Sequence, residues 1–134
     1  MKRTIWPSVV VILALPMTTC LAQEQPLICF GNEPFWGLDL TEAGKARFST
    51  PDSSAVDYLG TANTLAPRQE SIWRGQGAVA DSGDLVAFIR EGECSDGMSN
   101  TLHPYSVNIS LPGGRHYAGC CRLSDAAKLN FDGI

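Results

Sequence analysis

The sequence predicts an all-β fold, a small antiparallel barrel of about eight short strands that is cross-linked by disulfides. Strong helical periodicity is almost absent from the 134 residues. Short apolar or alternating runs recur instead, separated by Gly, Pro, Asn and Asp, the residues typical of turns. Because a single open sheet of this size would leave unpaired edge strands, we expect a closed or nearly closed barrel.

Four strands are expected in the first half of the chain. Residues 27–30 form a short apolar run. Residues 35–40 alternate between apolar and other side chains, as a strand with one buried face does, and the turn-prone segment 41–44 follows. Residues 46–50 end at a Pro-Asp pair, and residues 55–59 form the fourth run.

Four more strands are expected in the second half. Residues 71–74 form a short run, and the apolar run 85–90 is the clearest buried strand. Residues 105–111 alternate cleanly and lead through the Pro-Gly-Gly turn at 112–114 into residues 115–120. This pair of runs is the strongest hairpin signal in the chain.

The two ends of the chain depart from the strand pattern. At the C-terminus, Ser124 can cap a short helix over 125–130. At the N-terminus, a basic start, an apolar run and small residues predict a cleaved signal peptide, 1–22, which leaves one β-barrel-like domain, 23–134. The apolar run is too short for a transmembrane helix, which needs about 20 residues. As the alternative to soluble release, Cys20 is the lipid-accepting cysteine of a bacterial lipoprotein.

Composition and charge limit the location and the partners. The formal net charge is −4, and the Lys and Arg residues are scattered singly, which argues against nucleic-acid binding because that needs a basic patch. We expect the protein in the periplasm, and at the periplasmic face of the outer or inner membrane if Cys20 is lipidated. Membrane association is expected only through that lipid.

The cysteine count predicts two disulfides. Removal or lipidation of Cys20 leaves four cysteines, an even number that favours disulfides in an exported chain. A bond between the neighbours Cys120 and Cys121 is disfavoured by disulfide geometry, so Cys29 and Cys94 should each bind one of them. Which pairs with which stays open. Because adjacent strand residues face opposite sides, one bond can lie in the core and the other on the surface.

Three motifs stand out from ordinary strands and loops. They are Gly-Asn-Glu-Pro-Phe-Trp at 31–36, Cys-Ser-Asp-Gly-Met-Ser at 94–99 and Gly-Cys-Cys at 119–121. In this order they resemble a mostly uncharacterised family of small bacterial envelope proteins, often described as lipoproteins or membrane-associated proteins. The resemblance implies an envelope location and a compact β domain, with no settled activity. The chain has Asn100-Thr101 and His103 where that family usually has Asp-Arg and Tyr.

The motifs allow a structural and a functional interpretation. In the first, turn residues and disulfides simply hold the barrel closed, with the tryptophan in its core. In the second, polar residues of the first two motifs line one rim of the barrel, and barrel mouths are common sites for ligands or partners. The candidate binding residues are Asn32, Glu33, Trp36, Ser95, Asp96 and His103.

No catalytic constellation is recognisable, so we expect a non-enzymatic binding or structural module whose partner is a protein or an envelope component. One alternative is a periplasmic inhibitor of a lysozyme-like hydrolase, because an acidic chain is steered toward a basic enzyme. Another is a metal or small-ligand binder that uses Glu33, Asp96 and His103, although His103 and His116 match no standard metal-ligand spacing. No cofactor is expected.

Overall fold

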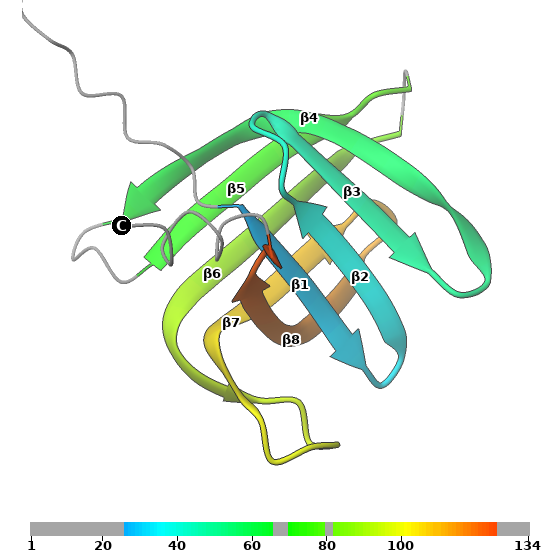
Figure 1. Cartoon of the computed structure of the whole chain (residues 1–134). Coiled ribbons are helices and arrows are strands. Elements are labelled where there is room, and N and C mark those ends of the chain that lie inside the picture. The colour runs from blue at the N-terminus through cyan, green and yellow to red at the C-terminus, as the bar shows by residue number, and fades with distance from the viewer. Residues whose placement is uncertain (1–25, 66–69, 80–81, 126–134) are drawn as a thin grey trace, which may run out of the picture.

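The computed structural model describes residues 26–65, 70–79 and 82–125 of the chain. They form a closed antiparallel barrel in which each strand pairs with the next and the last strand pairs with the first (Figure 1). The predicted closed antiparallel barrel is therefore confirmed. The strands are β1 Leu27–Asn32, β2 Phe35–Leu40, β3 Lys45–Thr50, β4 Ser53–Leu65, β5 Glu70–Gly77, β6 Asp84–Ser95, β7 Leu102–Leu111 and β8 Arg115–Leu123.

The predictions for the two ends of the chain fall outside the described residues. The predicted signal peptide 1–22, which contains Cys20, lies there entirely, and the predicted helix over 125–130 lies there beyond its first residue, so the structure does not show it. Within the described ranges, no helix has the length and apolar character needed to cross a membrane.

Every predicted run lies within a strand, but two strands extend far beyond their apolar runs. β4 has 13 residues and β6 has 12. The polar second half of β4 continues to pair with β5 as far as Leu65, opposite Glu70. The cross-strand hydrogen bonds of a ladder join backbone groups whatever the side chains are. A strand boundary placed at the end of an apolar run therefore comes too early.

The core fills the inside of the barrel. Leu38, Leu85, Val107 and Ile109, from the three strands β2, β6 and β7, are each 1% exposed or less. Their neighbours along each strand face outward, which is the period of two that the sequence shows. Burial of each such aliphatic side chain stabilises the fold by about 1.5–3 kcal/mol.

An aromatic cluster adds to this core. The Trp36 ring stacks against Phe48 and Tyr117, with centroid distances of 6.3 and 6.1 Å. Gly31 and Gly119 lie against the indole, where a Cβ on either glycine would overlap the ring. Trp36 is only 5% exposed, so this member of the first motif packs in the core.

The barrel closes where β1 meets β8. Their register sets Cys29 opposite Cys121, and these two residues form a disulfide that is fully buried in the core. The second disulfide joins Cys94 to Cys120. Because adjacent residues of a strand face opposite sides, Cys121 points inward and Cys120 points outward. The expected core bond is confirmed as Cys29–Cys121, whereas the second bond lies outside the barrel wall but not on the surface, since Cys120 is only 1% exposed. The pairing that the sequence left open is resolved.

Candidate functional site

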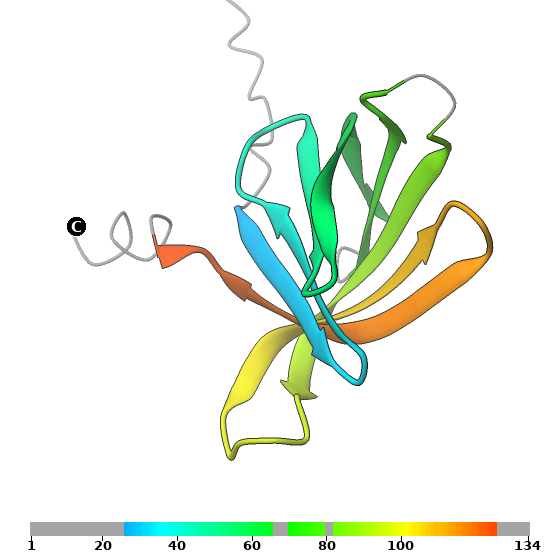
Figure 2. The same cartoon turned by 90° about the vertical axis from the view of Figure 1, so that its right-hand side faces the viewer.

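The β6–β7 hairpin projects from one end of the barrel (Figure 2). Its two strands pair from Val86 and Ser110 to Ser95 and Leu102, with a register shift between Glu91 and Cys94. An irregularity of this kind bends and twists a strand pair and re-aims its tip. Here the stem of the hairpin, below its tip, is held against β1 and β8 by the contacts described next.

Two cross-strand pairs meet at this place. Cys94 lies opposite His103 in the hairpin, and Phe30 lies opposite Cys120 in the barrel wall. The disulfide joins Cys94 to Cys120, and the His103 ring contacts the Phe30 ring edge-on, with a centroid distance of 4.8 Å and an interplanar angle of 83°. Although Cys120 points outward, it is only 1% exposed, because the hairpin covers it.

A hydrogen bond joins the first two motifs. The side-chain amide of Asn32, at the end of β1, donates from Nδ2 to the backbone oxygen of Asp96 at 3.0 Å. We call the three contacts, Cys94–Cys120, Phe30–His103 and Asn32–Asp96, the hairpin latch. The latch brings together motifs that are about 60 residues apart in the chain, as expected for a barrel whose register sets distant residues side by side.

The Asp96 carboxylate shapes the loop between β6 and β7. Its Oδ1 accepts hydrogen bonds from the backbone N–H groups of Met98 and Ser99, at 2.9 and 3.0 Å. Its Oδ2 lies 3.4 Å from His103 Nε2. The N–H donors, with a smaller contribution from His103, hold the pKa of Asp96 below its usual value, because they stabilise the charged form. Gly97 has a φ of 74°, which suits the Asp-Gly turn expected from the sequence.

The structure separates the candidate residues into three groups. Asn32, Asp96 and His103 come together in the hairpin latch, against the outer wall of the barrel. Glu33 and Ser95 are exposed beside it, and the Ser95 hydroxyl accepts a hydrogen bond from the Gly97 N–H at 3.2 Å. The sixth candidate, the tryptophan, lies inside the barrel as described above.

Three exposed apolar side chains around the latch were not singled out from the sequence. Met98 is 69% exposed, Leu102 is 56% exposed, and Phe35, the first residue of β2, is also 56% exposed. The sequence carried a signal for Met98 and Leu102, since each is an apolar residue inside a polar, turn-rich segment. Strand alternation carried a signal for Phe35 as well, since it sets Phe35 on the face of Gly37 and Asp39, opposite Trp36 and Leu38.

The hairpin is also acidic. Glu91 and Glu93 are exposed on β6, and no Lys or Arg occurs anywhere in residues 91–114. Glu33 adds a further exposed carboxylate on the β1–β2 turn. The surface around the latch therefore combines negative charge with exposed apolar side chains.

The comparisons with known proteins add no assignment to this geometry. No family model, no curated protein and no solved structure matches the chain. Among the described residues, no group of three or more His, Cys, Asp and Glu side chains is placed to hold a metal ion.

Proposed function

We propose that this protein is a non-enzymatic binding module that acts outside the cytoplasm and docks a basic protein partner with its β6–β7 hairpin. One observation carries the proposal: the β6–β7 loop is held in place by the latch and yet exposes the apolar side chains of Met98 and Leu102. The latch and the Asp96 turn order the loop before a partner arrives. Such ordering raises affinity because less conformational entropy is lost on binding.

Charge supports the choice of partner. The hairpin carries carboxylates, and residues 91–114 contain no Lys or Arg that would neutralise them. This negative charge favours encounter with a positively charged surface. Apolar side chains at the tip, Met98 and Leu102, supply the desolvated centre that protein interfaces need.

The proposed location rests on the predicted signal peptide and on the two disulfides. Disulfides persist in oxidising compartments such as the periplasm, and are rare in the cytosol. The envelope is therefore the place where we propose that the partner is met, either by a soluble protein or by one anchored through a lipid on Cys20.

Site-specific photo-crosslinking in cells tests this proposal. A photoreactive amino acid replaces Met98, and in a control it replaces Leu59, which is equally apolar and 58% exposed on β4. We expect one defined protein adduct from position 98, absent from position 59. The change Glu93→Lys should weaken the adduct, whereas Asp84→Lys, at the other end of β6, should not. The same adducts from both positions, or none from either, would refute the proposal.

A second candidate function is inhibition of a lysozyme-like hydrolase, and the projecting hairpin of Figure 2 favours it. A narrow, rigid hairpin can enter an active-site cleft, and lysozymes are basic enzymes that an acidic hairpin would attract. Titration of the protein into lysozymes of several types, with cell-wall lysis as the readout, tests it. We expect loss of lysis that Met98→Asp abolishes and Leu59→Asp leaves intact. Undiminished lysis at a molar excess of the protein would discard this candidate.

A further inference from the structure

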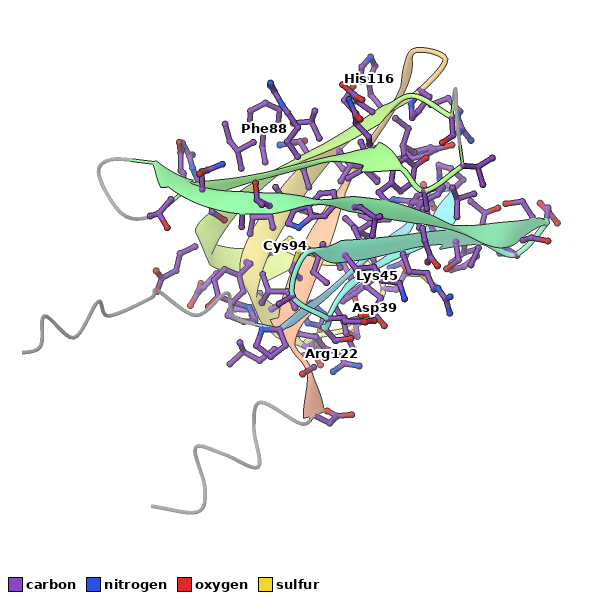
Figure 3. The ribbon with its side chains drawn as sticks, turned by 90° about the horizontal axis from the view of Figure 1, so that it is seen from above. Asp39, Lys45, Phe88, Cys94, His116 and Arg122 are labelled. Atoms are coloured by element: carbon purple, nitrogen blue, oxygen red, sulfur yellow. A yellow bond between two sulfur atoms is a disulfide. The ribbon has the colours of Figure 1, made fainter. Side chains whose placement is uncertain are left out.

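A second surface lies on the outer face of β5–β8, away from the hairpin latch. The register aligns Ile72, Phe88, Asn108 and Ala118 in one row that crosses these four strands. Phe88, at the centre of the row, is 49% exposed. Phe88 and His116 lie on the same side of the barrel and point away from it (Figure 3).

Two shallow depressions flank this row, and both include Phe88 and Asn108. The first, of about 310 Å³, is lined also by Glu70, Arg90 and Ser106. The second, of about 300 Å³, is lined also by residues of β7 and β8 that include Ser110, His116 and Tyr117. Rows of side chains on one face of a strand are about 7 Å apart, so the depressions lie over the rows on either side of the one that contains Phe88. An exposed ring thus stands between a mainly polar hollow, beside Glu70 and Arg90, and a second hollow whose lining is mostly apolar.

We propose that this face binds a neutral saccharide chain, with Phe88 as the platform for a sugar ring. A pyranose has a face of C–H groups and a rim of hydroxyls. The negatively polarised face of a phenyl ring suits the C–H face. Asn108 offers both a donor and an acceptor to hydroxyls, and its side chain makes no hydrogen bond within the described residues. The two hollows would take sugar units on either side of the platform.

The charges in the first hollow, which is lined by Glu70 and Arg90, favour a neutral ligand. Arg90 donates hydrogen bonds to Glu70 Oε1 from both Nε, at 2.8 Å, and Nη2. The opposite charges of Arg90 and Glu70 neutralise each other. The guanidinium has five N–H groups, so those not bound to Glu70 can donate to a hydroxyl. The hollow beside Phe88 is therefore polar without a net charge that would select an anion or a cation.

The composition of the face also separates it from a protein-docking surface. The described part of β5–β8 has two large apolar side chains that are exposed, Phe88 and Leu102. Leu102 lies at the hairpin tip, so Phe88 is the one on this face. A protein interface needs a cluster of apolar groups at its centre. A single exposed ring flanked by the Asn108 amide, the Arg90 guanidinium and the hydroxyls of Ser106 and Ser110 matches a sugar better.

Binding to immobilised oligosaccharides tests the proposal. The purified protein is applied to an array that holds neutral chains, including chitotetraose, cellotetraose and maltoheptaose, beside charged heparin fragments. We expect binding to at least one neutral chain and a weakening of about tenfold by Phe88→Ala. Phe88→Trp should preserve the affinity, because it keeps the platform, and Asn108→Ala should lower it. Leu59→Ala is the matched control, since it removes an equally exposed apolar side chain from β4.

A second measurement locates the ligand without a variant. Addition of the bound saccharide to isotope-labelled protein should shift the amide resonances of Phe88, Asn108 and His116 and leave those of the hairpin tip unchanged. Absence of binding to every neutral chain, binding to charged chains alone, or shifts confined to the hairpin would each overturn the proposal. Because the two surfaces are separate, such a failure leaves the proposed docking by the hairpin unaffected.

Discussion

At the scale of single residues, the close approach of Gly31 to Trp36 leaves no room for a side chain at position 31 of the first motif. A Cβ at Gly31 would overlap the indole, whereas a Cβ at Gly37, on β2, would lie 3.4 Å from the Ser49 hydroxyl. We predict that Gly31→Ala lowers the free energy of unfolding by about 1–3 kcal/mol through overpacking. Gly37→Ala should leave it unchanged or raise it slightly, since it only restricts the unfolded chain. Urea unfolding of the two variants distinguishes these outcomes, and equal midpoints would contradict the assignment.

The contribution of the Asp96 carboxylate to folding stability depends on pH. Its folded-state pKa lies below the ordinary value of 3.8, chiefly because the Met98 and Ser99 N–H groups bind the carboxylate. A depressed pKa adds stability that is present above the ordinary value and is lost as the pH falls through the folded-state pKa. Asp96→Asn should therefore be less stable than the parent at pH 7, and the difference should shrink below pH 3.8. Denaturant unfolding from pH 7 to pH 3 measures this. A constant difference would refute the charge argument, and exposed Asp84→Asn serves as the control.

At the scale of elements, the β6–β7 hairpin depends on its latch more than the barrel does. The Cys94–Cys120 bond spans 26 residues and lies outside the barrel wall. We predict that the double change of both cysteines to alanine opens the hairpin and leaves the barrel folded. Hydrogen exchange should show lost protection over residues 91–103, with the amides of β2–β4 unchanged. Uniform loss of protection over all strands would show instead that the latch supports the whole fold.

The elements also show which features were predictable. The strands were predictable because their signals are local: alternation in 105–111, the apolar run 85–90 and the Pro-Gly-Gly turn between β7 and β8. The hairpin latch was not, because it depends on the register of β1 with β8 and on the bend near Glu91, and neither leaves a local signal. Even so, three of the six candidate residues meet there, since turn-forming polar residues mark loops that carry contacts. The row around Phe88 could not be predicted from the sequence, because it depends on the register of four strands.

At the scale of the whole molecule, all pairings but one join strands that are neighbours along the chain. The exception is β1 with β8, where Cys29 and Cys121 are 92 residues apart. Closing a loop of this length costs about 4.6 kcal/mol of chain entropy, and the disulfide removes that cost from folding. The barrel therefore separates two tasks between its disulfides. The core bond favours closure, and the outer bond positions the hairpin that we propose as the docking element.

This division of tasks predicts a difference in folding rate. In the unfolded oxidised chain, Cys29–Cys121 already holds β1 beside β8, so refolding avoids the longest search in the topology. We expect the variant with both of these cysteines changed to alanine to refold about tenfold or more slowly than the parent in stopped-flow dilution from urea. Loss of the Cys94–Cys120 bond should slow refolding much less, because the latch forms on a wall that must already exist. If the two variants refold equally fast, barrel closure is not the step that limits folding, and the core disulfide acts only by slowing unfolding.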